Sequence, residues 1–207
     1  MYRNSNGHIS NWQDLFTGGM ETSSVIVEWG LAELMQHKEI TRTLQGELDR
    51  VIGKDRLMSE EDISNLPYLQ AIVKEMMRMH PVGPLLAPHE STRACEVAGF
   101  YVPEKTRLLV NIWSLSMDPS SWDEPHEFRP QRFLNSDIDL KGHHFQLLPF
   151  GAGRQACLAM NLGLLNVHQI LGSLVHSRGT LCFLIIVWCN YCFLVILWCN
   201  YCVLLIV

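Results

Sequence analysis

The chain has 207 residues, of which 48% are hydrophobic and 18% charged, and its formal net charge at pH 7 is −5. This length suffices for one sizeable core, and a negative net charge gives no reason to expect nucleic-acid binding. Only Cys95 and Cys157 of the seven cysteines lie in the first 180 residues. This excludes a disulfide framework there and is typical of a reducing compartment.

Four segments in the first 81 residues have helical patterns: 14–36, 39–53, 59–67 and 68–81. Near-helical spacing of apolar residues defines the first one: Val25, Ile26, Trp29, Ala32 and Leu34. The second ends at Gly53, and the third is short, with Ser59 as N-cap and an acidic first turn. The fourth ends at Pro81, and one apolar face of it is formed by Leu69, Ile72, Val73 and Met76.

The residue composition changes after residue 81. Prolines, β-branched residues and the turn-like AGFYVPEKT predict short strands or hairpins within 81–110. Prolines also punctuate 119–133, which is expected to be a loop. The last good helix is expected at Cys157–His176. The predicted fold is therefore mainly α with a small β element.

The C-terminal tail differs from the rest. CFLIIVWCNY and CFLVILWCNY, residues 182–191 and 192–201, are near copies, and residues 181–207 carry no charge. Such a run is long enough to span a bilayer, whereas a near-perfect ten-residue repeat also suggests translated non-coding sequence. The Cys-Asn-Tyr-Cys pairs lack the polar surroundings of a zinc site. We expect two parts: 1–177, and a repetitive hydrophobic tail, 178–207, that is either non-native or membrane-associating.

One cysteine stands between a glycine-rich loop and an apolar helical run, in PFGAGRQACLAMNLGLL. A thiol at a helix start meets unpaired backbone N–H groups and the positive end of the helix dipole, and both favour the thiolate. The glycines let a flat or bulky group approach, and Arg154 could meet a carboxylate. A buried structural cysteine is the commoner alternative. A nucleophile is a third, but phosphatase-type loops place arginine after the cysteine.

Four motifs together resemble the cytochrome P-450 family. FGAGRQAC, Phe150 to Cys157, is similar to its haem-binding loop, and EMMR supplies its Glu-x-x-Arg pair as Glu75 and Arg78. FRPQRF adds Arg132, and GGMETS matches the oxygen-activating helix. PHEST, VNIWSLSMDP and DLKGHHFQLLPFGAGR look like the plant A-type branch. The resemblance covers about residues 13–177, the C-terminal third of a complete member, and implies the C-terminal part of that fold.

The resemblance implies roles at the cofactor. Cys157 would be the axial ligand of the iron of haem b, whose cysteinate favours O–O cleavage. The cofactor-binding residues would be Phe150, Gly151, Gly153, Arg154, Cys157 and His89, and His89 and Arg154 would reach haem propionates. Glu75, Arg78 and Arg132 would form a structural triad, although Glu75 and Arg78 alone, at i and i+3, would more often be a solvated surface pair.

The resemblance also implies an oxygen and substrate side. Gly18 and Gly19 would widen the helix to admit dioxygen, unless the helix simply begins after them. Glu21 and Thr22 would deliver protons. Val82, Leu85 and Leu86 would lie in a strand lining the substrate pocket together with the two glycines, with an ordinary core strand as the equal alternative.

Some residues depart from the family pattern. The Arg-x-Cys-Pro-Gly context is here Gln155, Cys157, Leu158 and Ala159, and Gln131 replaces a glutamate. From the polar opening MYRNSNGHIS we expect neither a signal peptide nor an anchor, and the resemblance implies that the early helices of the family are missing.

The resemblance predicts a haem-thiolate monooxygenase that inserts one atom of O2 into a small hydrophobic molecule. Electrons would come from NADPH through an NADPH-cytochrome reductase, at the cytosolic face of the endoplasmic reticulum membrane. The 207-residue chain itself is expected to be inactive. The alternatives are a non-catalytic truncated or pseudogene product and a tail-anchored interaction fragment.

Overall fold

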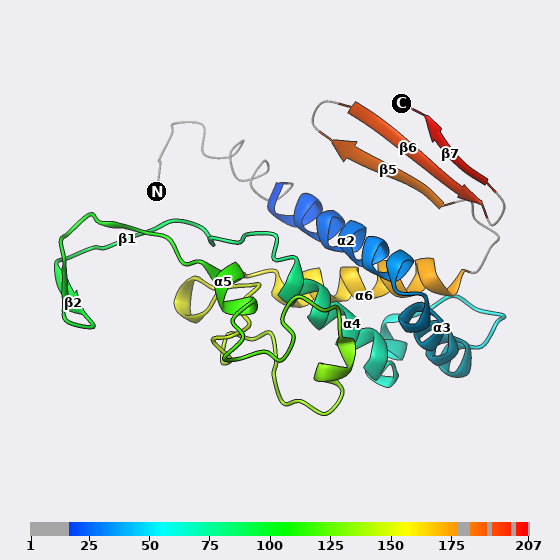
Figure 1. Cartoon of the computed structure of the whole chain (residues 1–207), viewed down its shortest axis with the longest axis horizontal. Coiled ribbons are helices and arrows are strands. Elements are labelled where there is room, and N and C mark those ends of the chain that lie inside the picture. The colour runs from blue at the N-terminus through cyan, green and yellow to red at the C-terminus, as the bar shows by residue number, and fades with distance from the viewer. Residues whose placement is uncertain (1–16, 178–182, 190–191, 200–201, 207) are drawn as a thin grey trace.

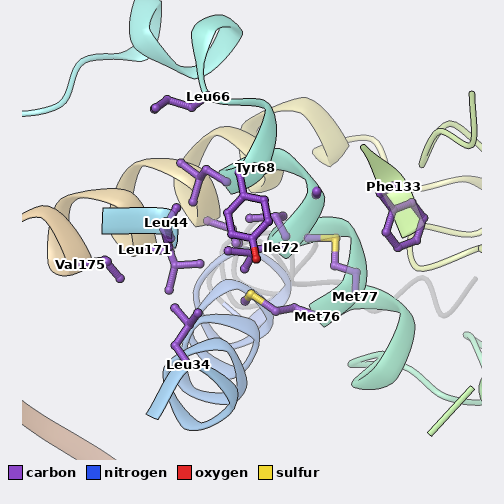
Figure 2. Packing of buried hydrophobic residues seen from close by; sticks show 14 of the residues in the cluster. Leu34, Leu44, Leu66, Tyr68, Ile72, Met76, Met77, Phe133, Leu171 and Val175 are labelled. Carbon is purple, nitrogen blue, oxygen red and sulfur yellow. The ribbon is translucent and has the colours of Figure 1, made fainter. Parts of the chain in front are cut away.

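The computed structural model describes residues 17–177 together with the backbone of 183–189, 192–199 and 202–206. Three helices, α2 (Thr22–Gln36), α4 (Pro67–Met79) and α6 (Met160–His176), pack on one another, and α3 (Lys38–Ile52) adjoins them at one end (Figure 1). Figure 2 shows Leu34, Leu44, Met76 and Leu171, one from each helix, in the same buried cluster. The expectation of a mainly α fold is confirmed.

Helix α4 is the most deeply buried of the four, as its sequence predicts. The four residues of its expected apolar face are fully buried. Pro67 occupies the first turn, where a missing N–H costs nothing. The helix ends at Met79, before Pro81, because the residue preceding a proline disfavours the helical conformation.

The other predicted helix signals are also found. Helix α3 stops at Gly53, whose φ of 82° suits glycine. The short segment η2 (Glu60–Asn65) is a 3₁₀ helix, and Ser59 and Asp62 form its capping box. Helix α6 begins at Met160 rather than at the expected Cys157, because Ala156 is extended and a turn precedes the helix.

The β element is an arm that extends away from the helices in Figure 1. Strand β1 (His89–Glu90) pairs with β4 (Arg107–Leu108), and β2 (Cys95–Val97) pairs with β3 (Phe100–Val102), both antiparallel. Ala98 and Gly99 close the inner hairpin with φ of 50° and 84°, as a tight two-residue turn requires. Two short segments were not expected: helix α5 (Ile112–Ser116) and the 3₁₀ turn η3 (Pro130–Phe133).

The C-terminal strands form a sheet of their own. Strands β5 (Phe183–Cys189), β6 (Cys192–Cys199) and β7 (Cys202–Ile206) are antiparallel neighbours in that order. Across the described residues, none of the helices is long and apolar enough to cross a bilayer. The two expectations for the origin of the tail remain predictions.

Candidate functional site

The loop that carries Cys157 is closed by its own backbone. The N–H of Cys157 donates to the carbonyl of Phe150 at 2.9 Å, and the N–H of Gly151 donates to Leu148 at 3.0 Å. Between them lies the short turn η4 (Gly153–Gln155). Gly151 and Gly153 have φ of 72° and 69°, a conformation that costs other residues energy. The Gly-x-Gly spacing is therefore needed to build the loop itself.

The outer side of this loop is open. The Cys157 side chain is exposed, the neighbouring Leu158 is fully exposed, and a Cβ placed on Gly153 would meet nothing within 4 Å. The alternative of a buried structural cysteine is therefore wrong. A large flat group can approach the thiol without displacing backbone.

The donor set around the thiol fits haem. Within the described part of the chain, no three His, Cys, Asp or Glu side chains cluster so as to hold a metal ion. A metal carried inside a macrocycle needs only an axial ligand from the protein, and a cysteine thiolate is one of the known axial ligands of haem iron. Arg154 is exposed on η4, within the same loop.

The helix that the resemblance assigns to oxygen activation begins with a π-helical turn, η1 (Thr17–Glu21), which continues into α2. The alternative that the helix begins after Gly18 and Gly19 is therefore wrong. The hydroxyl of Thr22 donates to the Gly18 carbonyl at 2.8 Å. In the same way, Ser23 donates to the carbonyl of Gly19 and Ser24 to that of Met20. Glycines and hydroxyls thus accommodate a widened turn of a kind that is frequent at functional sites.

Glu75, Arg78 and Arg132 meet in a buried network. Arg78 donates from Nε and Nη2 to the two oxygens of Glu75 at 2.8 and 2.9 Å, and Arg132 Nε donates to Glu75 Oε1 at 3.0 Å. Glu75 and Arg78 are both fully buried. A solvated surface pair is therefore excluded.

Arg78 uses its guanidinium to tie three segments together. Beyond Glu75 it donates to the backbone carbonyls of Ser116, Pro125 and Glu127, and the ring of Trp122 lies 5.3 Å from its Cζ. Every N–H of the guanidinium therefore has a partner, as a buried charge requires. These hydrogen bonds join α4 to α5 and to the proline-rich loop, residues 119–133.

The expected substrate strand is not formed. Val82, Leu85 and Leu86 lie in a turn before β1, in which the N–H of Leu86 donates to Gly83 and the φ of Leu86 is 51°. Val82 and Leu85 are exposed, so the core-strand alternative also fails. The left-handed residue interrupts an extended strand. The Leu85 carbonyl accepts from Val110, so the turn stays attached to the chain before α5.

The remaining candidates lie on separate elements. Glu21 and Thr22 are exposed at the junction of η1 and α2, and His89 is half-buried on β1. The structure thus joins the three triad residues in one network, while Glu21, Thr22 and His89 lie on elements other than the cysteine loop.

Several positioning contacts were missed by the sequence analysis. Glu47 of α3 accepts the backbone N–H groups of Tyr68 and Leu69 and so caps α4. Its signal was a glutamate between Leu44 and Leu48 on the apolar face of α3.

Two further contacts were missed. Glu33 Oε1 lies 2.7 Å from Nε2 of His80, whose ring stacks on Trp29, and this contact joins α2 to the end of α4. Lys74 Nζ donates to the Ile138 carbonyl at 2.8 Å, and burial lowers the pKa of Lys74.

Comparison with known proteins assigns the chain to a family. The family model described as Cytochrome P450 matches residues 8–177. A flavonoid 3',5'-hydroxylase of Campanula medium is 51% identical over 167 residues, and Cytochrome P450 98A2 of Glycine max is 47% identical over 163; each alignment covers 79% of this chain and 32% of the relative. A zebra fish cytochrome P450 structure with progesterone superposes with a TM-score of 0.72 at 36% identity, over 79% of this chain and 36% of that one. The chain spans about a third of the length of these curated relatives, and it belongs to the cytochrome P450 family.

Proposed function

We propose that this chain carries the cysteine-ligand part of a haem-thiolate monooxygenase, with Cys157 as the axial ligand. The observation that supports this most directly is the exposed thiol on a loop held by Gly151 and Gly153, open on its outer side. Haem, when bound, would supply the activation of O2 for insertion of one oxygen atom into a small hydrophobic substrate.

The chain's own residues would orient the thiol, bind the cofactor and transfer protons. The backbone bond from Cys157 to Phe150 orients the thiol, and Arg154 and His89 would bind the carboxylates of the cofactor. The Thr22 hydroxyl donates a hydrogen bond to the Gly18 carbonyl, so its oxygen can still accept a hydrogen bond, and Glu21 directly precedes it in sequence. These two residues would pass protons to the oxygen side, and Gly18 and Gly19 would leave room there.

The substrate and partners are proposed from the relatives. Flavonoids are the first class to test, because relatives named flavonoid 3',5'-hydroxylase are 45% to 54% identical to this chain. Val82, Leu85 and Leu86 would contribute apolar contacts. Electrons would come from NADPH through a reductase at the cytosolic face of the endoplasmic reticulum membrane.

Cys157→Ser tests the ligand assignment. The 207-residue chain is produced in the presence of a haem precursor, reduced and exposed to carbon monoxide, with Cys95→Ser as the control because Cys95 is the other exposed cysteine of the described residues. Cys157→Ser should abolish the red-shifted band of thiolate-bound haem, and Cys95→Ser should leave it intact. An unchanged band in Cys157→Ser would contradict the assignment.

A second candidate is a non-catalytic fragment. Large apolar side chains are exposed near the cysteine loop and at the start of α6, namely Phe145, Leu158 and Leu162. They favour association or adsorption over turnover. We therefore expect the 207-residue chain, assayed with reductase and NADPH, to form no substrate-dependent product; product with stoichiometric haem would reject this candidate.

A further inference from the structure

The cysteine loop packs against Gly142, a residue of the segment DLKGHHFQLLPFGAGR to which the sequence analysis assigned no role. A Cβ placed on Gly142 would lie 2.9 Å from the carbonyl oxygen of Gly151, 3.1 Å from Cα of Ala152 and 3.2 Å from its Cβ. Two of these three atoms are backbone, which cannot move aside as the end of a long side chain can. The residue-142 backbone therefore packs directly on the cysteine loop.

The segment that carries Gly142 is itself fixed. Leu140 and Leu147 are buried, and the Asp139 carboxylate accepts the N–H of Lys141 at 2.9 Å, a bond that lowers the pKa of Asp139. Lys74 of α4 holds the preceding carbonyl, that of Ile138. Gly142 thus contacts the loop from a segment that is bound to α4 and packed in the core.

From these contacts we infer that Gly142 is a positioning residue for the Cys157 thiol. It acts through Gly151, which directly follows Phe150, the residue whose carbonyl accepts the Cys157 N–H and so closes the loop. A methyl group at position 142 would displace the Gly151 carbonyl and, through the loop, the sulfur. The importance of this displacement for haem rests on the proposed function, whereas the loop contact itself does not.

A matched glycine separates this contact from ordinary backbone strain. Gly142 and Gly99 both have φ of 84°, so alanine is strained by a left-handed φ at either position. A Cβ on Gly99 meets nothing within 4 Å. Gly142→Ala adds the clash with the loop, and Gly99→Ala does not.

The experiment compares the two variants in the 207-residue chain. Haemin is titrated into haem-free protein, and the thiolate band is recorded with carbon monoxide. Separately, the alkylation rate of Cys157 in the haem-free protein is measured by mass spectrometry. Gly142→Ala should weaken haemin binding about tenfold, the lower end of the range for residues that orient a metal ligand, with loss of the thiolate band and faster alkylation of Cys157. Gly99→Ala should match the parent chain in all three.

Each outcome decides the inference. Equal behaviour of the two alanine variants would overturn it, since Gly142 would then be only a turn glycine. If the parent chain shows no thiolate band, the proposed function fails, but the alkylation rates still decide the role of Gly142. If Gly142→Ala is insoluble and Gly99→Ala is soluble, the difference supports the clash with the loop, because both positions share a left-handed φ; if both variants are insoluble, the inference is overturned.

Discussion

Replacing Glu75 with glutamine should strongly destabilise the fold, because the Glu75 carboxylate neutralises a fully buried arginine. It accepts four hydrogen bonds: two from Arg78, one from Arg132 and one from the backbone N–H of Arg129. Glutamine keeps one acceptor oxygen and turns an NH2 group toward N–H donors. Removing one partner of a buried ion pair costs about 3–5 kcal/mol, a large share of the roughly 5–15 kcal/mol by which domains are stable.

Glu47→Gln is the matched control for Glu75→Gln. Glu47 is also buried, but its oxygens accept two backbone N–H groups at 2.9 and 3.0 Å rather than a guanidinium. Loss of one such helix-capping bond costs about 1–2 kcal/mol. Urea unfolding followed by far-ultraviolet circular dichroism should therefore rank Glu75→Gln well below Glu47→Gln in free energy of unfolding.

A double variant tests whether the stranded charge is the cause. Adding Arg78→Met to Glu75→Gln removes the uncompensated cation, and the double variant should recover part of the lost free energy of unfolding. If Glu75→Gln costs no more than Glu47→Gln, or if the two substitutions at the pair simply add, the electrostatic account of this network is wrong.

Two further predictions concern α3 and α6. Burial lowers the pKa of His168 below its ordinary 6.5, so the folded chain resists protonation of this imidazole and the free energy of unfolding should fall as pH drops below 6.5. In urea titrations at several pH values, His168→Asn should remove this part of the pH dependence. An identical pH profile for the variant and the parent chain would contradict the prediction. Gly46→Ala should stabilise α3 by roughly 0.5–1 kcal/mol in thermal unfolding, since its Cβ meets nothing within 4 Å. Gly172→Ala should show no such gain, because the new carbon would collide with Met58 Sδ; equal gains would refute the packing argument.

Much of the helical fold could be predicted because its signals are local. The apolar face of α4, the stop at Gly53 and the cap at Ser59 each involve neighbours within a few positions. Helix α5 was missed because five residues give too little periodicity to recognise. The start of α6 was misplaced because the extended conformation of Ala156 depends on the closed loop rather than on its own propensity.

The candidate site was predictable where a motif names residues and not where packing decides. The motifs predicted the triad of Glu75, Arg78 and Arg132, but only the fold shows that Glu75 and Arg78 are fully buried. Val82 and Leu85 were predicted to lie in a strand, yet the left-handed conformation of Leu86 places this segment in a turn.

Helix α4 holds the segments around the candidate site through three of its side chains. It supplies Glu75 and Arg78, which hold α5 and the proline-rich loop, and it supplies Lys74, which holds the Ile138 segment. That segment brings Gly142 against Gly151, nine positions further along the chain, in the loop that carries the thiol. Because rigid, fully buried elements hold a ligand more precisely than a free loop does, the exposed cysteine can be both open to a large cofactor and fixed in direction.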